Sequence, residues 1–189
     1  LSYGQHCSML FSARLVTPLS PTPSLLRFWQ WYTQLRMSQQ YDFVAIGDIL
    51  VDAFIELSKD DADVSVDLDT GRQTLQMPFG SKVPYKDVTV INAVGNSPNA
   101  AVSAHRLGLH TALVSNLGND RNGKDCLEAL RTEGVHTDFV RLHEGKHTNY
   151  HYVLRYGPER TILIKHEVFD YQLPDFPVPP RFIYFSSIG

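Results

Sequence analysis

The stretch that most constrains the fold runs from Val94 to Gly123 and alternates turns with regular elements. Ser97 can cap a helix, Pro98 suits its first position, and Gly108 suits a left-handed exit. We therefore expect a helix over roughly Pro98 to Leu107. Its inward residues are small, which lets the helix lie close against a sheet; they are Ala100, Ala101 and Ala104.

Gly95 stands just before this helix. Because glycine has no side chain, the backbone N–H groups at the helix start stay open to a ligand. We expect Gly95 and the amide side chains of Asn96 and Asn99 to contact a ligand. A tight strand-to-helix connection without a ligand would explain the same glycine.

Phe43 to Leu50 is an apolar run without alternation, which predicts a strand covered on both faces in a mostly parallel sheet. Ligands of open α/β sheets bind outside the carboxyl ends of such strands. Asp52 follows this run and is placed to accept hydrogen bonds from hydroxyl groups, with Asp48 as a second contact; a solvated or helix-capping role for Asp52 is the alternative. The run lacks G-x-G-x-x-G, which argues against a dinucleotide site.

Three further segments carry secondary-structure signals. A helix is predicted over Lys124 to Glu133, with Asp120 as its structural cap. Alternation around the turn at Asp69, Thr70 and Gly71 predicts a hairpin within Ser58 to Lys86. A second hairpin is predicted from Thr148 to Lys165, with an aromatic face that includes Tyr150 and Tyr152. Residues 173–180 form a proline-rich connector, and residues 181–186 read as another buried strand.

Residues 94–123 resemble the first signature of the ribokinase-like (PfkB) carbohydrate kinases, close to G-G-x-x-x-N-x-A, an A-R-L-G-like helix end and G-x-D-x-x-G. The matching positions are Gly95, Asn99, Ala101, Arg106, Leu107, Gly108, Gly118, Asp120 and Gly123. Val94 stands where the family has its first glycine. The spacing from Gly47 to Asp52 also resembles the G-x-x-x-x-D that opens these sequences.

The resemblance implies an α/β fold: a ribokinase-like, three-layer, doubly wound, mostly parallel sheet, here truncated, with a small antiparallel β lid. It implies ATP-dependent phosphorylation of a sugar or related alcohol, with Mg²⁺ accompanying ATP. The substrate-binding residues would be Asp48, Asp52, Gly95, Asn96 and Asn99. Lid segments would lie at about residues 58–86 and 148–166, where Thr148, Tyr150 and Tyr152 would act and where two copies could pair into a homodimer.

The family's D-T-x-G-A-G-D-like motif, whose last aspartate is the catalytic base, does not occur between Asp120 and Gly189. We therefore expect this chain to be the amino-terminal part of a kinase, without its own catalytic residue and inactive alone. Two alternatives stay open: a truncated non-catalytic module that binds a sugar or nucleoside, and a fragment of an adenosine-like nucleoside kinase.

The composition of the chain narrows the remaining classes of function. A formal net charge of -3 gives no sign of nucleic-acid binding, and no apolar run reaches the length of a membrane span. The two cysteines, Cys7 and Cys126, favour a reducing, cytoplasmic location, with Cys126 as a buried structural thiol. We expect no metal site from His143, His147 and His151, because their four-residue spacing falls on turn and strand.

The first residues differ from the rest of the chain. Residues 1–36 contain no Asp or Glu and several Ser and Pro. Met37 is followed by a short polar stretch and then a good strand. We predict that residues 1–36 are a disordered leader, such as a transit peptide, or a non-native extension, and that residues 37–189 form the kinase domain portion.

Overall fold

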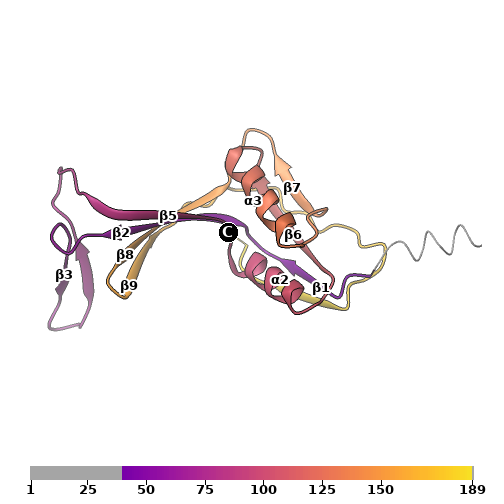
Figure 1. Ribbon diagram of the computed structural model, residues 1–189, viewed down its shortest axis with the longest axis horizontal. Coiled ribbons are helices and arrows are strands. Elements are labelled where there is room, and N and C mark those ends of the chain that lie inside the picture. Colours follow the sequence, from indigo (N-terminus) through magenta and orange to yellow (C-terminus); the bar gives the residue numbers. More distant parts are fainter. Residues whose placement is uncertain (1–39, 189) are drawn as a thin grey trace, which may run out of the picture. The chain divides into compact units, whose positions relative to one another are not determined.

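The computed structural model describes residues 40–188 (Figure 1). The predictions for residues 1–36 lie outside the described residues. A four-stranded parallel sheet contains, in order across the sheet, β10 (Phe182–Phe185), β1 (Phe43–Ile46), β6 (Thr111–Gly118) and β7 (Val140–His143). This sheet and the helices beside it confirm the predicted α/β class.

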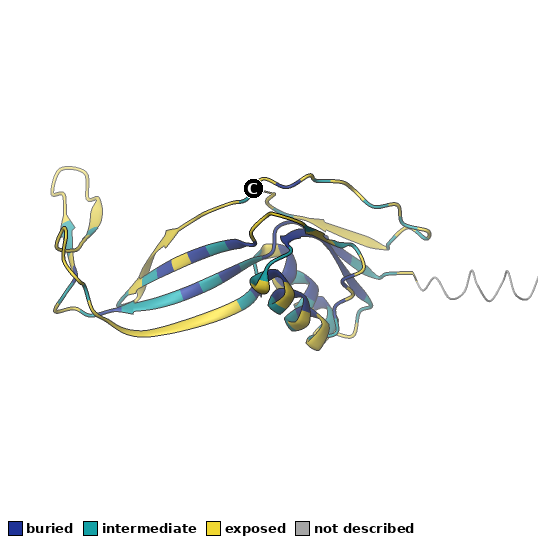
Figure 2. Ribbon diagram, turned by 90° about the horizontal axis from the view of Figure 1, so that it is seen from above, coloured by how far each residue is buried: buried dark blue, intermediate teal, exposed yellow. Residues whose placement is uncertain are grey.

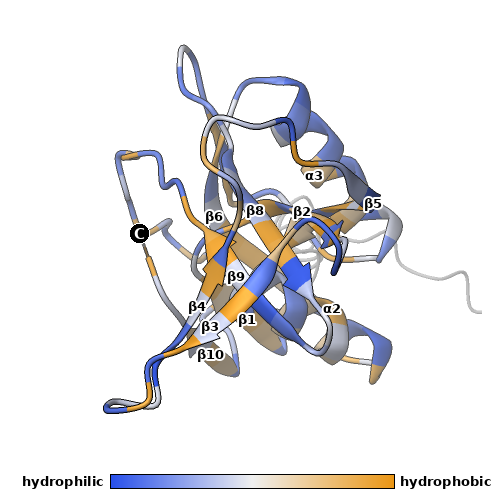
Figure 3. Cartoon of the chain, turned by 90° about the vertical axis from the view of Figure 1, so that its left-hand side faces the viewer, coloured by the Kyte–Doolittle hydropathy of each residue, from blue (hydrophilic) through white to orange (hydrophobic). Residues whose placement is uncertain are grey.

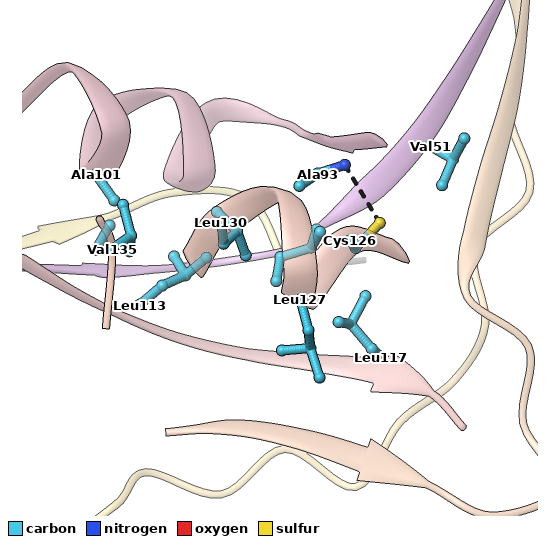
Figure 4. Close-up of a cluster of buried hydrophobic side chains, with 11 residues drawn as sticks. Val51, Ala93, Ala101, Leu113, Leu117, Cys126, Leu127, Leu130 and Val135 are labelled. Carbon is cyan, nitrogen blue, oxygen red and sulfur yellow. Dashed lines mark hydrogen bonds between the residues drawn. The ribbon is translucent and has the colours of Figure 1, made fainter. Parts of the chain in front are cut away.

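Two helices cover one face of the parallel sheet, α2 (Asn96–Arg106) and α3 (Arg121–Thr132). Side chains from both helices pack with β1 and β6 in a buried cluster that includes Ala45, Ala101, Leu113, Cys126, Leu127 and Leu130 (Figure 4). Ala101 and Ala104 are buried on the inner side of α2, as predicted, whereas Ala100 is only partly buried. Burying one Leu side chain of this kind contributes about 1.5–3 kcal/mol.

The other face of the sheet is covered differently. Val44, Ile46, Ala112 and Val114 form a second buried cluster, against which Phe139 and Phe176 pack. Phe176 belongs to the extended proline-rich segment between β9 and β10, and this connector has no helix or strand, as predicted. The strands are coloured in a mixture of orange and blue, whereas α2 and α3 are largely blue (Figure 3).

A second sheet contains, in order, β5 (Tyr85–Val94), β2 (Leu50–Leu57), β8 (Asn149–Tyr156) and β9 (Glu159–Leu163). β2 is antiparallel to β5 and parallel to β8, and β8 and β9 form the predicted second hairpin. The first predicted hairpin is also present, as β3 (Asp63–Val66) and β4 (Gln73–Gln76). Much of β5 is exposed, whereas β2 and β8 alternate between buried and more exposed residues (Figure 2).

Two predicted boundaries were wrong. The strand expected over residues 43–50 ends at Ile46, and β2 begins at Leu50, so Asp52 lies inside a strand instead of beyond one. The chain bends at Gly47, where a Cβ atom would lie 2.3 Å from the hydroxyl oxygens of Ser97 and Ser186. Only glycine fits that close approach.

The expected helix start was also misplaced. α2 begins at Asn96, and its N-cap residue is Gly95, which makes no side-chain cap. Ser97 is buried inside the first turn, and its hydroxyl lies 2.6 Å from that of Ser186 instead of capping the helix. The exit was predicted correctly, because Gly108 follows the helix with φ of 91°. Neither described helix is long and apolar enough to cross a membrane.

Candidate functional site

The carboxyl end of β1 meets the start of α2. Gly95 packs so tightly there that a Cβ atom would lie 2.7 Å from the backbone oxygen of Asp48. Since Gly95 makes no side-chain cap, the first N–H groups of α2 are left without the usual capping oxygen. The structure thus brings Asp48 and Gly95 together.

The turn before α2 is formed by Ala93 and Gly95, which have φ of 57° and 131°. Val94 between them has no positive φ, so this position does not require glycine. Ala93 is held there by its backbone N–H, which donates to Cys126 Sγ at 3.2 Å (Figure 4). Burial raises the pKa of Cys126 to about 11, so the thiol stays protonated and structural, as predicted.

Five polar side chains gather near this turn, and we call them the strand-end cluster: Asp48, Asp52, His151, His166 and Tyr171. Asp48 is only 7% exposed. Tyr171 donates its hydroxyl to Asp48 Oδ1 at 3.2 Å, and His166 Nδ1 lies 3.8 Å from Asp48 Oδ2. Burial, then the Asp48 charge and hydrogen bond, raise the pKa of Tyr171 to about 12, so Tyr171 remains a donor.

Asp52 and His151 are neighbours across β2 and β8. His151 Nδ1 lies 3.6 Å from Asp52 Oδ1, which is too long for a hydrogen bond but close enough for attraction. Burial raises the pKa of Asp52, an effect that His151 and Arg160 partly offset. Burial likewise lowers the pKa of His151, although Asp52 opposes this.

The Asp52 and His151 pair has unused hydrogen-bonding capacity. Within residues 40–188, neither Asp52 Oδ1 nor His151 Nε2 has a hydrogen-bond partner, although both atoms are buried. Such groups lose the hydration they had in the unfolded chain, at a cost of about 1–3 kcal/mol each. The His151 and His166 rings lie edge to face at 5.2 Å and join this pair to Asp48.

Two hollows lie close to the cluster. A cavity of about 250 Å³ is lined by Gly47 and Tyr171 together with mainly apolar residues of β1, β6 and β10. The second lies on the sheet face that carries Asp52, and its lining is Phe54, Glu56, Asp87, Thr89, Ile91 and Arg155. Neither hollow is lined by Asp52 itself, but Ile91, which lines the second, pairs with Asp52 across β2 and β5.

The remaining predicted residues lie apart from this pair. Asn96 and Asn99 are exposed on the first turn of α2, and Asn99 lines a hollow between α2, β5 and α3. No contact in the described residues joins either asparagine to Asp52. The pairing of β2 with β5 relates Asp52 to Asn96 indirectly. Leu50 pairs with Val94, and Asp52 and Asn96 each follow one of these paired residues by two positions.

The predicted lid residues Thr148, Tyr150 and Tyr152 lie just before β8 or within it, away from Asp52. Tyr150 and Tyr152 flank His151 on β8, so they lie on the opposite face of the sheet from Asp52. Their rings are 5.1 Å apart, and Tyr150 packs against the main core. Thr148 is buried just before β8 and donates its hydroxyl to Asp120 Oδ1 at 2.7 Å.

Asp120 is a structural centre, as the sequence predicted. Its carboxylate accepts the backbone N–H groups of Gly123 and Thr148 at 2.8 and 3.0 Å. Burial alone would raise the pKa of Asp120, but the hydrogen bonds from Thr148 and Gly123 outweigh it and lower the pKa. Asp120 therefore caps α3 and fastens it to the start of β8.

Sequence reasoning missed His166 and Tyr171. Both lie after the second hairpin, in a stretch without periodicity, and contact Asp48 from more than a hundred residues away. His151 was visible on the polar face of the predicted strand, beside Asn149 and Arg155. In the structure, the face of β8 that carries His151 is the one beside Asp52, and the aromatic face with Tyr150 and Tyr152 is on the other side of the sheet.

Comparison with known proteins gives matches at the levels of sequence family and fold. Residues 66–180, more than half of the chain, match the family model of the pfkB family carbohydrate kinases. This range includes α2 and α3 and begins after Asp52.

Two curated relatives match shorter stretches. A protein of Pyrococcus horikoshii described as a sugar kinase is 36% identical over 75 residues, which are 39% of this chain and 24% of that protein. Fructosamine kinase FrlD of Bacillus subtilis is 34% identical over 62 residues, which are 33% of this chain and 22% of FrlD. The matched parts of this chain thus span about a quarter of the length of these relatives.

Two ribokinase structures share the fold. The Arabidopsis thaliana ribokinase, solved with ribose and ATP, has a TM-score of 0.53 and 24% identity over 67% of this chain and 36% of that one. The Cryptococcus neoformans ribokinase, solved with ADP, has a TM-score of 0.54 and 20% identity over 76% of this chain and 39% of that one. The described residues therefore have a ribokinase-like fold.

Proposed function

Because this chain belongs to the pfkB family of carbohydrate kinases, we propose that the whole protein uses ATP to phosphorylate a hydroxyl group of a sugar or related alcohol. In this proposal the present chain supplies the substrate-binding side of the site. The observation that carries it is the Asp52 and His151 pair, whose buried atoms Asp52 Oδ1 and His151 Nε2 have no hydrogen-bond partner within residues 40–188.

Each residue of the site has a distinct role in the proposal. Asp52 and Asp48 accept hydrogen bonds from substrate hydroxyl groups, and His151 orients the Asp52 carboxylate. Gly95 keeps the N-terminal N–H groups of α2 open to a substrate oxygen. Asn96 and Asn99 would contact the substrate from the exposed first turn of α2.

The cover over the site is part of the same proposal. Residues 58–86 and 148–166 act as lid segments, with Thr148 fixing the base of β8 through Asp120 and with Tyr150 and Tyr152 on the outer face. Closure of such a cover excludes water from the reacting groups.

ATP supplies the phosphoryl group, and a Mg²⁺ ion neutralises charge between its phosphates. Within residues 40–188, no group of three or more His, Cys, Asp or Glu could hold a metal ion. The sequence also lacks a motif that would provide the catalytic base. We therefore assign both tasks to other parts of the whole protein, and expect the present chain to bind substrate without transferring phosphate.

A second copy of the chain is the proposed protein partner. On the face of the second sheet opposite Asp52, large apolar side chains remain exposed: Val88, Val90, Tyr152 and Leu163. Such a patch is typical of a surface that another protein covers. Light scattering should give the mass of a dimer, and Val90→Asp should return it to a monomer.

A free, buried thiol at Cys126 agrees with a reducing compartment, and we propose the cytoplasm. ATP is available to a kinase in that compartment.

Calorimetric titration of ribose, fructose, fructosamine and adenosine into the protein tests the substrate site. We expect one of these ligands to bind, and Asp52→Asn to weaken it by roughly ten- to a hundredfold, since a hydrogen bond to a charged group contributes about 1.5–3 kcal/mol. Asp125→Asn is the matched control, because Asp125 lies on α3 and pairs only with Arg121 among the described residues. Equal affinity in both variants would contradict the assignment of Asp52.

A further inference from the structure

Asn149 is a buried polar residue that has no role in the proposed site so far. It is the first residue of β8 and pairs with Leu50 of β2. Because side chains two positions apart on a strand point to the same face, Asn149 lies on the face of the sheet that carries His151 and Asp52. It is only 2% exposed.

One half of the Asn149 amide is used within the chain. Its Oδ1 accepts the backbone N–H of Glu167 at 2.7 Å. Turning the amide over would set two donors against each other, so its orientation is fixed. Within residues 40–188 the buried Nδ2 atom has no hydrogen-bond partner. Such donors are few in folded proteins because they lose the hydration of the unfolded chain, so Nδ2 is open to a bound molecule.

Three buried side-chain atoms that lack a partner within the described range lie together on this face: Asp52 Oδ1, Asn149 Nδ2 and His151 Nε2. Asn149 and His151 are about 6.6 Å apart along β8, a separation that one small molecule can span. An ionised carboxylate only accepts hydrogen bonds, an amide nitrogen only donates, and an imidazole nitrogen can do either. The three atoms therefore suit a molecule that both donates and accepts, as hydroxyl groups do.

The His166 ring lies against this face. It contacts the His151 ring edge to face, with centroids 5.2 Å apart, and its Nδ1 lies 3.8 Å from Asp48 Oδ2. Neither contact is a hydrogen bond. Since the His166 side chain is also 33% exposed, it can turn toward solvent and admit a ligand to His151 and Asn149.

We propose that Asn149 is a specificity-determining residue of the substrate site, whose Nδ2 donates to a hydroxyl oxygen next to the hydroxyl that Asp52 accepts. This inference rests on the proposed function and adds a selecting contact to it. An ammonium group cannot accept the hydrogen bond from Nδ2, and a missing hydroxyl leaves Nδ2 without a partner. The site therefore favours a polyol with neighbouring hydroxyl groups over its deoxy and amino forms at that position.

Calorimetry with the whole protein tests the inference. The probes are whichever of ribose, fructose, fructosamine and adenosine binds, and each mono-deoxy form of that compound. We expect one deoxy form to bind about tenfold more weakly than its parent compound. Asn149→Asp keeps the oxygen that accepts from Glu167 but replaces the donor by an acceptor. It should weaken the parent compound at least about tenfold and bind that deoxy form equally well, within about twofold.

Two further variants make the test independent of an added charge. Asn149→Ser removes the donor without adding a carboxylate and should abolish the same preference for the parent compound. Asn116→Asp is the matched control, because Asn116 is also buried and its Oδ1 likewise accepts a hydrogen bond, from His143 Nε2 at 2.8 Å. This control should keep the preference. Circular dichroism of each variant checks that the fold is retained.

The outcomes separate this inference from the proposed function. If both Asn149 variants keep the tenfold preference, Nδ2 bonds at most a buried water molecule and the inference is wrong. Weaker binding by Asp52→Asn would then still support the proposed function. If none of the compounds binds, or if Asp52→Asn binds as tightly as the unsubstituted protein, the proposed function fails and the inference fails with it.

Discussion

Asp52, which we propose binds substrate, opposes the stability of the folded protein at neutral pH. Its atom Oδ1 is buried beside His151 and has no hydrogen-bond partner within residues 40–188, and partial burial of the carboxyl group raises its pKa. The folded protein therefore holds a proton at Asp52 more readily than the unfolded chain does. The proton on Asp52 therefore adds to the stability of the folded protein. This contribution is fully present at pH values below the pKa of Asp52 in the unfolded chain, and it is lost as pH rises through its pKa in the folded protein.

Asp52→Asn should therefore stabilise the protein at neutral pH while it weakens substrate binding. We expect a gain of about 0.5–2 kcal/mol in the free energy of unfolding, the range that single stabilising substitutions commonly give. The gain should shrink as pH falls through the raised pKa of Asp52 toward its unfolded value. Urea denaturation between neutral and acid pH measures it, and a loss of stability at neutral pH would contradict this account.

Asp120 stabilises the folded protein at neutral pH, in contrast to Asp52. Its net pKa is lowered, because hydrogen bonds from Thr148 and Gly123 outweigh burial. Asp120→Ala should cost about 2–3 kcal/mol, since it removes a helix cap and hydrogen bonds to a charged group. The contribution is present above the unfolded pKa and is lost as pH falls through the folded pKa. Asp125→Ala on the same helix should cost less than about 0.5 kcal/mol, and equal costs in urea denaturation would contradict the role of Asp120.

The sequence allowed Asp120 to be predicted as a cap because capping depends on neighbours three residues away. It did not allow Ser97 to be assigned correctly, because Ser97 bonds Ser186 at the other end of the chain. His166 and Tyr171 were missed for the same reason. Contacts between distant segments depend on the completed fold, which no local pattern encodes.

At the scale of elements, the carboxyl ends of α2 and α3 are fastened together. Arg106 donates to Glu133 through Nε and Nη2, at 2.9 and 2.7 Å to Oε2. Next to this pair, Gly134 has φ of 79° and lies against the His105 ring, where a Cβ atom would be 2.2 Å from Nε2. This contact sets the spacing of the two helices.

Gly134→Ala should destabilise the protein by about 2–4 kcal/mol, which combines left-handed backbone strain with overpacking against His105. Gly71→Ala separates the two effects, because Gly71 has φ of 68° but nothing within 4 Å of its Cβ position. It should cost only about 1–2 kcal/mol. Equal thermal or urea stability of the two variants would show that His105 yields without cost.

Element types were predictable where periodicity was strong. Both hairpins and both described helices were found from alternation, caps and glycine exits. The strand β10 was found from its apolar run, but the prediction that it is buried was wrong, because all four of its residues are exposed. The division of the expected strand at Gly47 was not, because it follows from the close approach of Ser97 and Ser186. As a result Asp52 was placed beyond a strand end, although it lies in β2 beside His151.

For the whole molecule, the ribokinase-like fold places Asp48 just beyond the carboxyl end of β1. The rest of the strand-end cluster comes from the second sheet, where Asp52 lies in β2 and His151 in β8, and from the segment after β9, which carries His166 and Tyr171. The fold class was predictable from one family-like stretch, because turn glycines and helix ends have fixed spacing there. The pairing of Asp52 with His151 was not, since it depends on the register between β2 and β8.

The most direct measurement is a crystal structure of the whole protein with the sugar that binds tightest by calorimetry. Our account predicts a substrate hydroxyl oxygen within about 2.7–3.0 Å of an Asp52 carboxylate oxygen, with His151 still beside it. A sugar bound elsewhere, with Asp52 contacting only His151, would contradict it.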